Sequence, residues 1–262
     1  MPTAPFVYAR PSMALSKPAR AKSTFHTKSD LRMTKAIDFT RMHLRIGHRG
    51  AAGHAPENTL AAVELAIKLG VHMVEFDIRR SADGALVLLH DDMVDRTTNG
   101  EGRIQDLSLT VLREFDAGWG EKIPLLEEAL ACLTGRAGAM IELKVRGIAA
   151  DVCAKVQETN FSGPVIYASF LHEELITVRK LMADAPTLAL IEGGPIHSTA
   201  FATNVQATHA GLSLDTVTSD VVKALQEQGI RVFVYTVDDS ENIARMKQLG
   251  VDGIISNFPD RV

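Results

Sequence analysis

The sequence has no long hydrophobic run and very little cysteine. No apolar stretch approaches the ~20 residues that a helix needs to cross a bilayer, and no extended apolar segment near the N-terminus suggests a secretory signal. We therefore expect a soluble protein without an integral membrane segment. The two cysteines, Cys132 and Cys153, lie in stretches patterned as amphipathic helices. We interpret them as buried free thiols of a cytoplasmic protein, with a disulfide or a reactive thiol as the alternative.

Basic residues are scarce outside the first 45 positions. The formal net charge is −4, but residues 1–45 hold nine Lys or Arg and two Asp, which leaves 19 basic and 30 acidic residues for the remainder. An acidic body argues against a nucleic-acid surface, because such a surface needs a basic stripe to meet phosphates. We predict no nucleic-acid partner.

Residues 1–42 are rich in Ser, Ala, Pro, Thr, Lys and Arg and have little apolar periodicity. This composition predicts a flexible basic extension outside the fold. Three interpretations stay open: an organellar transit peptide, a disordered tail, or a start codon assigned too early, since Met13, Met33 and Met42 could each begin a shorter protein.

From Leu44 onward, short apolar runs alternate with helix-length amphipathic segments, which is typical of a parallel sheet with helical crossovers. Strands are predicted at residues 44–48, 73–78, 138–144, 164–169, 187–191, 210–214, 231–237 and 253–256. Helices are predicted at residues 57–69, 125–134, 147–159, 172–184, 196–206, 216–229 and 239–249. Eight strands joined by such crossovers indicate an α/β fold, a (β/α)₈ TIM barrel over residues 43–262.

Two irregularities interrupt this pattern. The chain stops at Val262, so the last helix is expected to be missing or reduced, and the N-terminal arm or a second copy of the chain could cover that side, giving a homo-oligomer. Residues 79–123 replace an ordinary loop between the second and third strands. Ala82-Asp83-Gly84 is a hairpin signal, so this insertion is predicted to begin as a ribbon and to continue as a small lid.

Three carboxylates are expected at the carboxyl ends of neighbouring strands, where active sites of such barrels lie. Glu75 and Asp77 are two residues apart on one strand and so face the same side, and Glu142 and Lys144 repeat this spacing on the next strand. An all-oxygen set favours a hard cation, Mg²⁺ first and Ca²⁺ as the alternative, over zinc. The other interpretation is that Arg79, Lys144 or Arg146 neutralises these carboxylates.

Two histidines are predicted to flank this acidic cluster. His48 ends the first strand, and His90 ends the returning arm of the ribbon. A pair brought together from segments so far apart suggests general acid and base catalysis, for which imidazole is suited near neutral pH. Arg49 and Lys144 could supply positive charge for phosphate oxygens. Asn58 and Thr59 are interpreted as helix caps, and His54 as a residue of a solvated loop.

Eight short motifs in this order resemble the glycerophosphodiester phosphodiesterase family, over about four fifths of the chain. They are His48-Arg49-Gly50, Pro56-Glu57-Asn58-Thr59, Glu75-Phe76-Asp77, Leu89-His90-Asp91 followed by Arg96-Thr97-Thr98, Ile141-Glu142-Leu143-Lys144, Ala168-Ser169-Phe170, Tyr235-Thr236-Val237 and Asp252-Gly253-Ile254-Ile255-Ser256-Asn257. The resemblance implies the same barrel fold.

The resemblance also implies an activity: metal-dependent hydrolysis of a small glycerophosphodiester to glycerol 3-phosphate and an alcohol. The cation would activate the glycerol 2-hydroxyl, one histidine would remove its proton, and the other would protonate the leaving alcohol, with water then opening a cyclic phosphate. By analogy His48 is the acid and His90 the base. Tyr235 stands where the family usually has Trp, and it would still offer an apolar face to the glycerol carbons.

Two other functions remain open at this point. A lysophospholipase D would act on substrates that keep an acyl chain, and it would need an apolar channel or a membrane-facing lid. A barrel that only binds phosphodiesters would be expected to have lost a metal ligand or a histidine, and the chain has all five of these residues.

Overall fold

A computed structural model describes residues 43–262, in which eight parallel strands close into a barrel. The barrel closes because the first strand pairs with both the second and the last. Around the barrel the strands are β1 (Leu44–Gly47), β2 (Met73–Arg80), β4 (Gly138–Leu143), β5 (Val165–Ser169), β6 (Thr187–Ile191), β7 (His209–Ser213), β8 (Arg231–Tyr235) and β9 (Gly253–Ser256). The TIM-barrel prediction is confirmed, and each predicted strand lies within two residues of the observed one.

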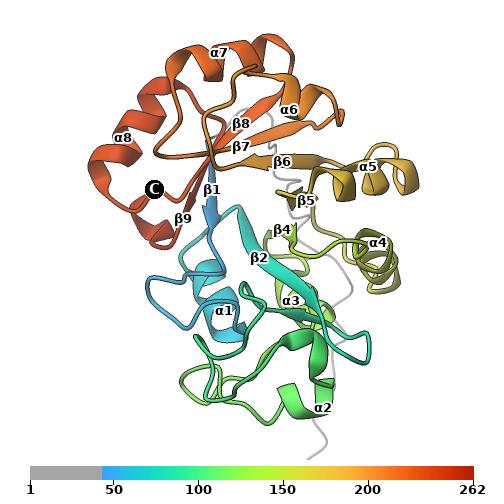
Figure 1. The fold of residues 1–262 in the computed structure, drawn as a ribbon. Helices are drawn as coiled ribbons and strands as arrows, with labels where there is room; N and C mark the ends of the chain where they lie inside the picture. Colours follow the sequence, from blue (N-terminus) through green and yellow to red (C-terminus); the bar gives the residue numbers. More distant parts are fainter. Residues whose placement is uncertain (1–42) are drawn as a thin grey trace, which may run out of the picture. The chain divides into compact units, whose positions relative to one another are not determined.

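Helices follow the strands and surround them on the outside (Figure 1). They are α1 (Leu60–Lys68), α3 (Leu126–Leu133), α4 (Ala149–Glu158), α5 (His172–Leu181), α6 (Ala200–Thr203), α7 (Ser219–Glu227) and α8 (Ser240–Leu249). After β9 the chain forms only the 3-10 helix η2 (Pro259–Arg261), as expected for a reduced last helix. None of the helices within residues 43–262 is long and apolar enough to cross a membrane.

The predicted helices are trimmed at several ends, for example at the end of α5 and the start of α7, and two of the differences have clear local reasons. Helix α1 begins later than predicted, because Thr59 is its N-cap and accepts a hydrogen bond from the Ala62 N–H. The predicted helix at 196–206 is reduced to α6 because residues 193–195, Gly-Gly-Pro, favour a loop and the chain becomes helical only at Ala200. The predicted extension at residues 1–42 lies outside the described residues.

The barrel interior is apolar at its centre and polar at its mouth. Side chains from β1, β2, β4, β5, β6, β8 and β9 fill the centre, and larger apolar clusters pack the helices against the outer face of the strands. The central side chains are Leu44, Ile46, Met73, Met140, Ile166, Ala168, Leu188, Leu190, Phe233 and Ile255. This layer supports the polar side chains that emerge at the carboxyl ends of the same strands.

The insertion between β2 and β4 starts as a ribbon, as predicted. Strand β3 (Leu86–Leu88) pairs antiparallel with the end of β2 after a turn at residues 81–85. The short elements η1 (Ile104–Asp106) and α2 (Leu109–Leu112) follow, at the bottom of the view in Figure 1. Val87, Val94, Ile104, Leu112 and Ile123 form a separate small core. Both cysteines are free, as predicted, but only Cys153 on α4 is fully buried, while Cys132 on α3 is partly exposed.

The structure predicts acid-sensitive folding through His209, at the start of β7. Burial and the nearby Arg231 lower the pKa of His209 to about 4, while its ordinary value is 6.5. Between pH 6.5 and pH 4, His209 is protonated in the unfolded chain but neutral in the folded protein. The free energy of unfolding therefore falls as pH falls from 6.5 toward 4, by up to about 3 kcal/mol.

We expect His209→Gln to lose less stability than the wild type over this range, in urea unfolding curves measured between pH 7 and pH 4. A variant with an unchanged pH dependence would contradict the assignment.

Candidate active site

Three buried carboxylates meet at the carboxyl ends of β2 and β4. Asp77 lies opposite Glu142 in the register of these strands, and Glu75 lies two residues before Asp77 on the same side. Oxygen atoms of Glu75, Asp77 and Glu142 all lie within 4.8 Å of one another. The structure thus brings together the three residues that the sequence predicted as cation ligands.

Each carboxylate is held on one oxygen by a fixed donor. The backbone N–H of Arg49 donates to Glu75 Oε2 at 2.8 Å, and Asn58 Nδ2 donates to Asp77 Oδ2 at 2.8 Å. Lys144 Nζ donates to Glu142 Oε1 at 2.6 Å. Glu75 Oε1 and Asp77 Oδ1 are buried and have no hydrogen-bond partner among residues 43–262. Buried oxygens without partners are costly, so this donor set fits a hard divalent cation.

The pKa values of the cluster reflect burial and the repulsion between neighbouring carboxylates. Burial and the neighbouring Asp77 and Glu142 carboxylates raise the pKa of Glu75 well above its usual range. Burial and Asp77 raise the pKa of Glu142 to about 7. Burial would also raise the pKa of Asp77, but Lys144 and Arg49 outweigh it and lower that pKa. The alternative interpretation was that basic side chains neutralise these carboxylates. Salt bridges from Lys144 to Glu142 and Asp77 support it for those two residues, but not for Glu75.

His48 is oriented by an amide that is itself fixed. Its Nδ1 lies 2.7 Å from Asn257 Oδ1, and Asn257 Nδ2 donates to Asp238 Oδ2 at 2.8 Å. Because Asn257 already uses its NH₂ group on Asp238, its oxygen must accept from His48, and Nδ1 therefore carries the proton. His48 Nε2 then lies 3.9 Å from Glu75 Oε2. Burial and Arg49 lower the pKa of His48 to about 4.

His90 has an analogous partner on the insertion. Its Nδ1 lies 2.6 Å from Asp91 Oδ1, and its carbonyl accepts from Arg79 Nε at 2.8 Å. Arg96 donates to Asp91 and, through two nitrogens, to Glu57. Burial lowers the pKa of His90, although Asp77 and Asp91 oppose the shift. Arg96 thereby ties the His90 segment to the loop that follows β1.

Arg49 contacts both the acidic cluster, through Asp77, and Glu57, which also binds Arg96. Its NH1 donates to Glu57 at 2.8 Å, and its Nε lies 3.4 Å from Asp77 Oδ2. Arg49 Nε is buried and has no hydrogen-bond partner within the described part of the chain. A buried N–H donor without a hydrogen bond to any described residue therefore lies beside the acidic cluster.

Tyr235 and Phe170 line a cavity at the barrel mouth. The two rings meet edge to face at 5.9 Å, Tyr235 Oη donates to Ile191 O, and Lys144 Nζ lies 5.9 Å from the centre of the Phe170 ring. His48, Glu75 and Glu142 line the cavity together with these aromatic rings. Aromatic rings and carboxylates thus line the same cavity.

Other polar residues follow the barrel strands without joining the three carboxylates. Ser169 is buried and bonds to Leu143 O and the Leu171 N–H, and Asp215 is exposed. His54 is exposed, as expected for a residue of a solvated loop, and pairs with Asp260. Among the other histidines, His43 and His172 bond to backbone carbonyls and His72 accepts from the Arg45 N–H. His209 packs against Phe233, and His197 is exposed.

Sequence reasoning missed four residues that support the site. Asn58 was interpreted as a helix cap, but Thr59 has that role and the Asn58 side chain binds Asp77. Asp91 and Arg96 lie within the motif Leu-His-Asp and Arg-Thr-Thr, which could have indicated a partner for His90. Nothing in the sequence pointed to Asp238, because its contact with Asn257 depends on how β8 and β9 end.

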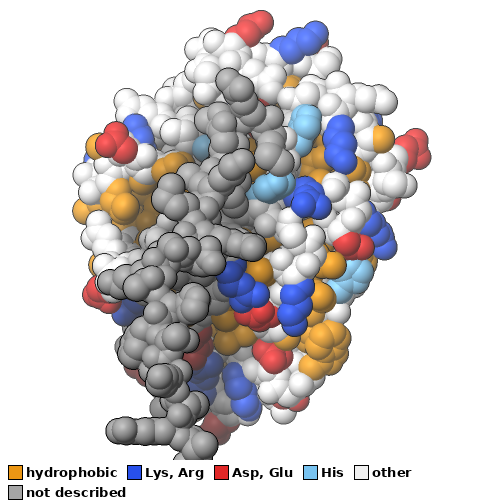
Figure 2. Space-filling view, turned by 180° about the vertical axis from the view of Figure 1, so that it is seen from behind, with side chains coloured by type: hydrophobic (Ala, Val, Ile, Leu, Met, Phe, Trp, Pro, Cys, Tyr) orange, Lys and Arg blue, Asp and Glu red, His pale blue; other side chains and the backbone are white. Residues whose placement is uncertain are grey.

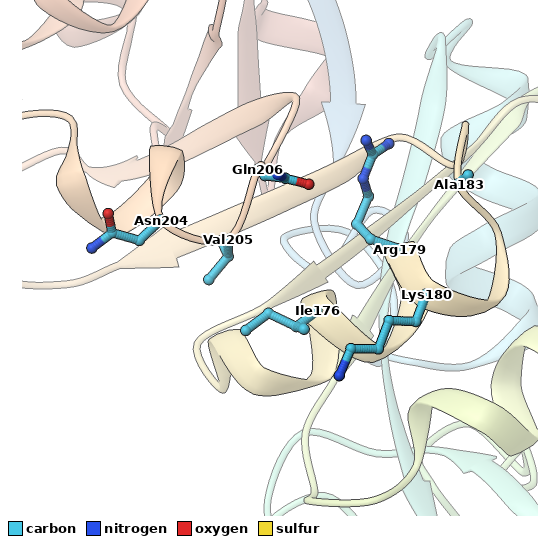
Figure 3. A pocket seen from close by; sticks show the side chains of 7 residues that line it. All are labelled: Ile176, Arg179, Lys180, Ala183, Asn204, Val205 and Gln206. Atoms are coloured by element: carbon cyan, nitrogen blue, oxygen red, sulfur yellow. The ribbon is translucent and has the colours of Figure 1, made fainter.

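A larger hollow lies outside the barrel, between the ends of α5 and α6. It has a volume of about 390 Å³ and is lined by Arg179, Lys180 and Gln206 among others (Figure 3). It contains no carboxylate and no histidine, so it lacks the groups of the barrel mouth. On the face drawn in Figure 2, basic and acidic side chains are interspersed with neutral ones.

A closed parallel barrel with an acidic cluster and two histidines at its mouth has the architecture of a barrel hydrolase. The chain belongs to the glycerophosphoryl diester phosphodiesterase family, whose family model matches residues 48–261. A glycerophosphodiester phosphodiesterase of Caldanaerobacter subterraneus subsp. tengcongensis is 33% identical, over 83% of this chain and 95% of its own. Another, from Bacillus subtilis, is 31% identical, over 83% of this chain and 84% of its own.

Solved structures agree with this assignment. An Oleispira antarctica phosphodiesterase, in complex with the product sn-glycerol-3-phosphate, is 28% identical with a TM-score of 0.78 and covers 82% of this chain and 93% of its own. A glycerophosphodiester phosphodiesterase from Agrobacterium tumefaciens is 30% identical with a TM-score of 0.74, over 84% of this chain and 98% of its own.

We predict that repulsion among the three carboxylates lowers the stability of the protein when no metal is bound. Because the folded-state pKa of Glu75 is raised, folding keeps a proton that the unfolded chain releases, and stability is lost as pH rises above about 5. Each pH unit over which this proton is kept corresponds to about 1.4 kcal/mol.

In EDTA, we expect Glu75→Gln to unfold at a higher temperature than the wild type, with a difference that grows between pH 5 and pH 8. Glu101→Gln, at an exposed position of the insertion, should show no such difference. A Glu75→Gln protein that is less stable at pH 8 would disprove the claimed repulsion.

Proposed function

We propose that this protein hydrolyses small glycerophosphodiesters to glycerol 3-phosphate and an alcohol, with one divalent cation, Mg²⁺ in preference to Ca²⁺. The observation that carries the proposal is the convergence of Glu75, Asp77 and Glu142 within 4.8 Å, inside a chain that belongs to this family. The relative with bound sn-glycerol-3-phosphate supports the same product.

The three carboxylates would hold the cation through their free oxygens. A bound divalent cation supplies Lewis-acid activation of the glycerol 2-hydroxyl and neutralises phosphate charge. Arg49 Nε and Lys144 Nζ would bind the phosphate oxygens, Arg49 through its unused donor and Lys144 as a point charge. Tyr235 and Phe170 would pack against the glycerol carbons.

The two histidines would move the protons. His90, held by Asp91, would take the proton of the 2-hydroxyl as the general base, and His48, held by Asn257, would give a proton to the leaving alcohol. The roles would reverse when water opens the cyclic phosphate. Burial and Arg49 lower the pKa of His48 to about 4, and the negative charge of a bound substrate would raise it, so that His48 could carry the proton that it gives to the leaving alcohol.

We also propose that residues 43–262 form one barrel domain and that residues 79–123 form its lid. The contacts of Arg96 support this role, because they join the His90 segment to Glu57 in the loop after β1. This connection would hold His90 beside the acidic cluster, where it already interacts electrostatically with Asp77.

Removal of the cation should abolish turnover. With glycerophosphocholine as substrate, we expect EDTA to reduce glycerol 3-phosphate release by about 100-fold or more, since no side chain can replace the Lewis acid. Mg²⁺ added back should restore the rate, and Ca²⁺ should restore it less. Choline release from lysophosphatidylcholine, measured in parallel, should be much slower. Full activity in EDTA would refute the metal dependence.

Each histidine should be needed for turnover but not for folding. We expect His48→Ala and His90→Ala to lower kcat by about 10²–10⁴-fold with little change in thermal unfolding, and His54→Ala to stay near the wild type. A substrate with a good leaving group, such as p-nitrophenol, needs no general acid and should largely restore His48→Ala but not His90→Ala. The opposite pattern would exchange the two roles.

A further inference from the structure

Asn58 is a buried residue with an unusual backbone conformation beside the acidic cluster. It is 2% exposed and has a φ of 57°, in the left-handed region that few residues other than Gly, Asn and Asp adopt. Its backbone N–H donates to Arg49 O at 3.0 Å. The loop after β1 therefore fixes Asn58 in place before α1 begins.

The Asn58 side chain binds Asp77 at two points. Its Nδ2 donates to Asp77 Oδ2 at 2.8 Å, and its Oδ1 accepts from the Asp77 N–H at 3.1 Å. These two bonds fix the rotation of the Asp77 carboxylate, and they determine that Oδ2 is the oxygen that accepts from Asn58. Asp77 Oδ1 is left without a hydrogen bond from any described residue and lies 3.4 Å from Lys144 Nζ.

We propose that Asn58 is a positioning residue that makes Asp77 a one-oxygen ligand and so biases the site toward Mg²⁺ over Ca²⁺. Mg²⁺ requires nearly ideal octahedral geometry, which one-oxygen carboxylates satisfy, while Ca²⁺ takes six to eight ligands and readily accepts both oxygens of a carboxylate. With Asp77 Oδ2 bound to Asn58, a large cation is denied that second oxygen. This inference rests on the proposed metal site.

The test compares cation affinities of the full-length wild type and Asn58→Gly by isothermal titration calorimetry with Mg²⁺ and Ca²⁺ separately. Glycine keeps the left-handed backbone and removes only the amide. Loss of such outer contacts typically costs 10–100-fold in metal affinity. We expect Mg²⁺ affinity to fall by about this factor and Ca²⁺ affinity to fall much less, so that the ratio of the two shifts toward Ca²⁺ by about 10-fold.

A second variant and a matched control separate the amide from folding and strain. Asn58→Asp keeps the size of the side chain but cannot donate to Asp77 when ionised. Its extra charge should raise both affinities, while the ratio still shifts toward Ca²⁺. Asn160→Gly changes another left-handed asparagine, with a φ of 51°, at the exposed end of α4. It should leave both affinities unchanged.

The outcomes distinguish this inference from the proposed function. A wild type that binds neither cation would refute the metal site itself. A wild type that binds Mg²⁺, with the same Mg²⁺ to Ca²⁺ ratio in a folded Asn58→Gly or Asn58→Asp, would overturn the role of Asn58 and leave the proposed function standing. If Asn58→Gly does not fold in a thermal unfolding assay, the ratio measured for Asn58→Asp decides.

Discussion

The repulsion among three buried carboxylates is the constraint on which the rest of the site depends. Glu75, Asp77 and Glu142 lie within 4.8 Å of one another in a pocket that holds two nearby cationic side chains, Arg49 and Lys144. Like charges at this distance and burial raise the cost of ionisation steeply. A folded protein keeps such an arrangement only if the surrounding structure fixes it, and a bound cation would relieve it.

The loop after β1 supplies much of that fixation. Arg49 and Asn58 both have left-handed backbones, with φ values of 48° and 57°, and each donates a hydrogen bond to one of the carboxylates. Such conformations cost energy and persist where tertiary contacts overdetermine them. The histidines are supported in a parallel way, His48 by Asn257 and His90 by Asp91. Each functional group therefore has a partner that sets its orientation.

The sequence was sufficient for the barrel and for the residues at its mouth. Apolar runs alternating with amphipathic segments predicted all eight barrel strands, and the i, i+2 spacing of Glu75 and Asp77 predicted that they converge, because that spacing depends only on strand geometry. The supporting contacts could not be predicted in this way. Asn58 before a helix has the composition of a cap, and only the tertiary position of β2 directs its amide to Asp77. Asp238 and Asn257 meet because they follow β8 and β9, which are neighbouring strands.

The central claim is that one divalent cation binds among Glu75, Asp77 and Glu142. Its most direct test is anomalous X-ray diffraction from crystals of the protein soaked in Mn²⁺, which substitutes for Mg²⁺ at oxygen sites and scatters anomalously. The account predicts a single strong anomalous peak in contact with one oxygen of Glu75, one oxygen of Asp77 and an oxygen of Glu142. A peak elsewhere at the barrel mouth, or no peak at saturating Mn²⁺, would contradict it.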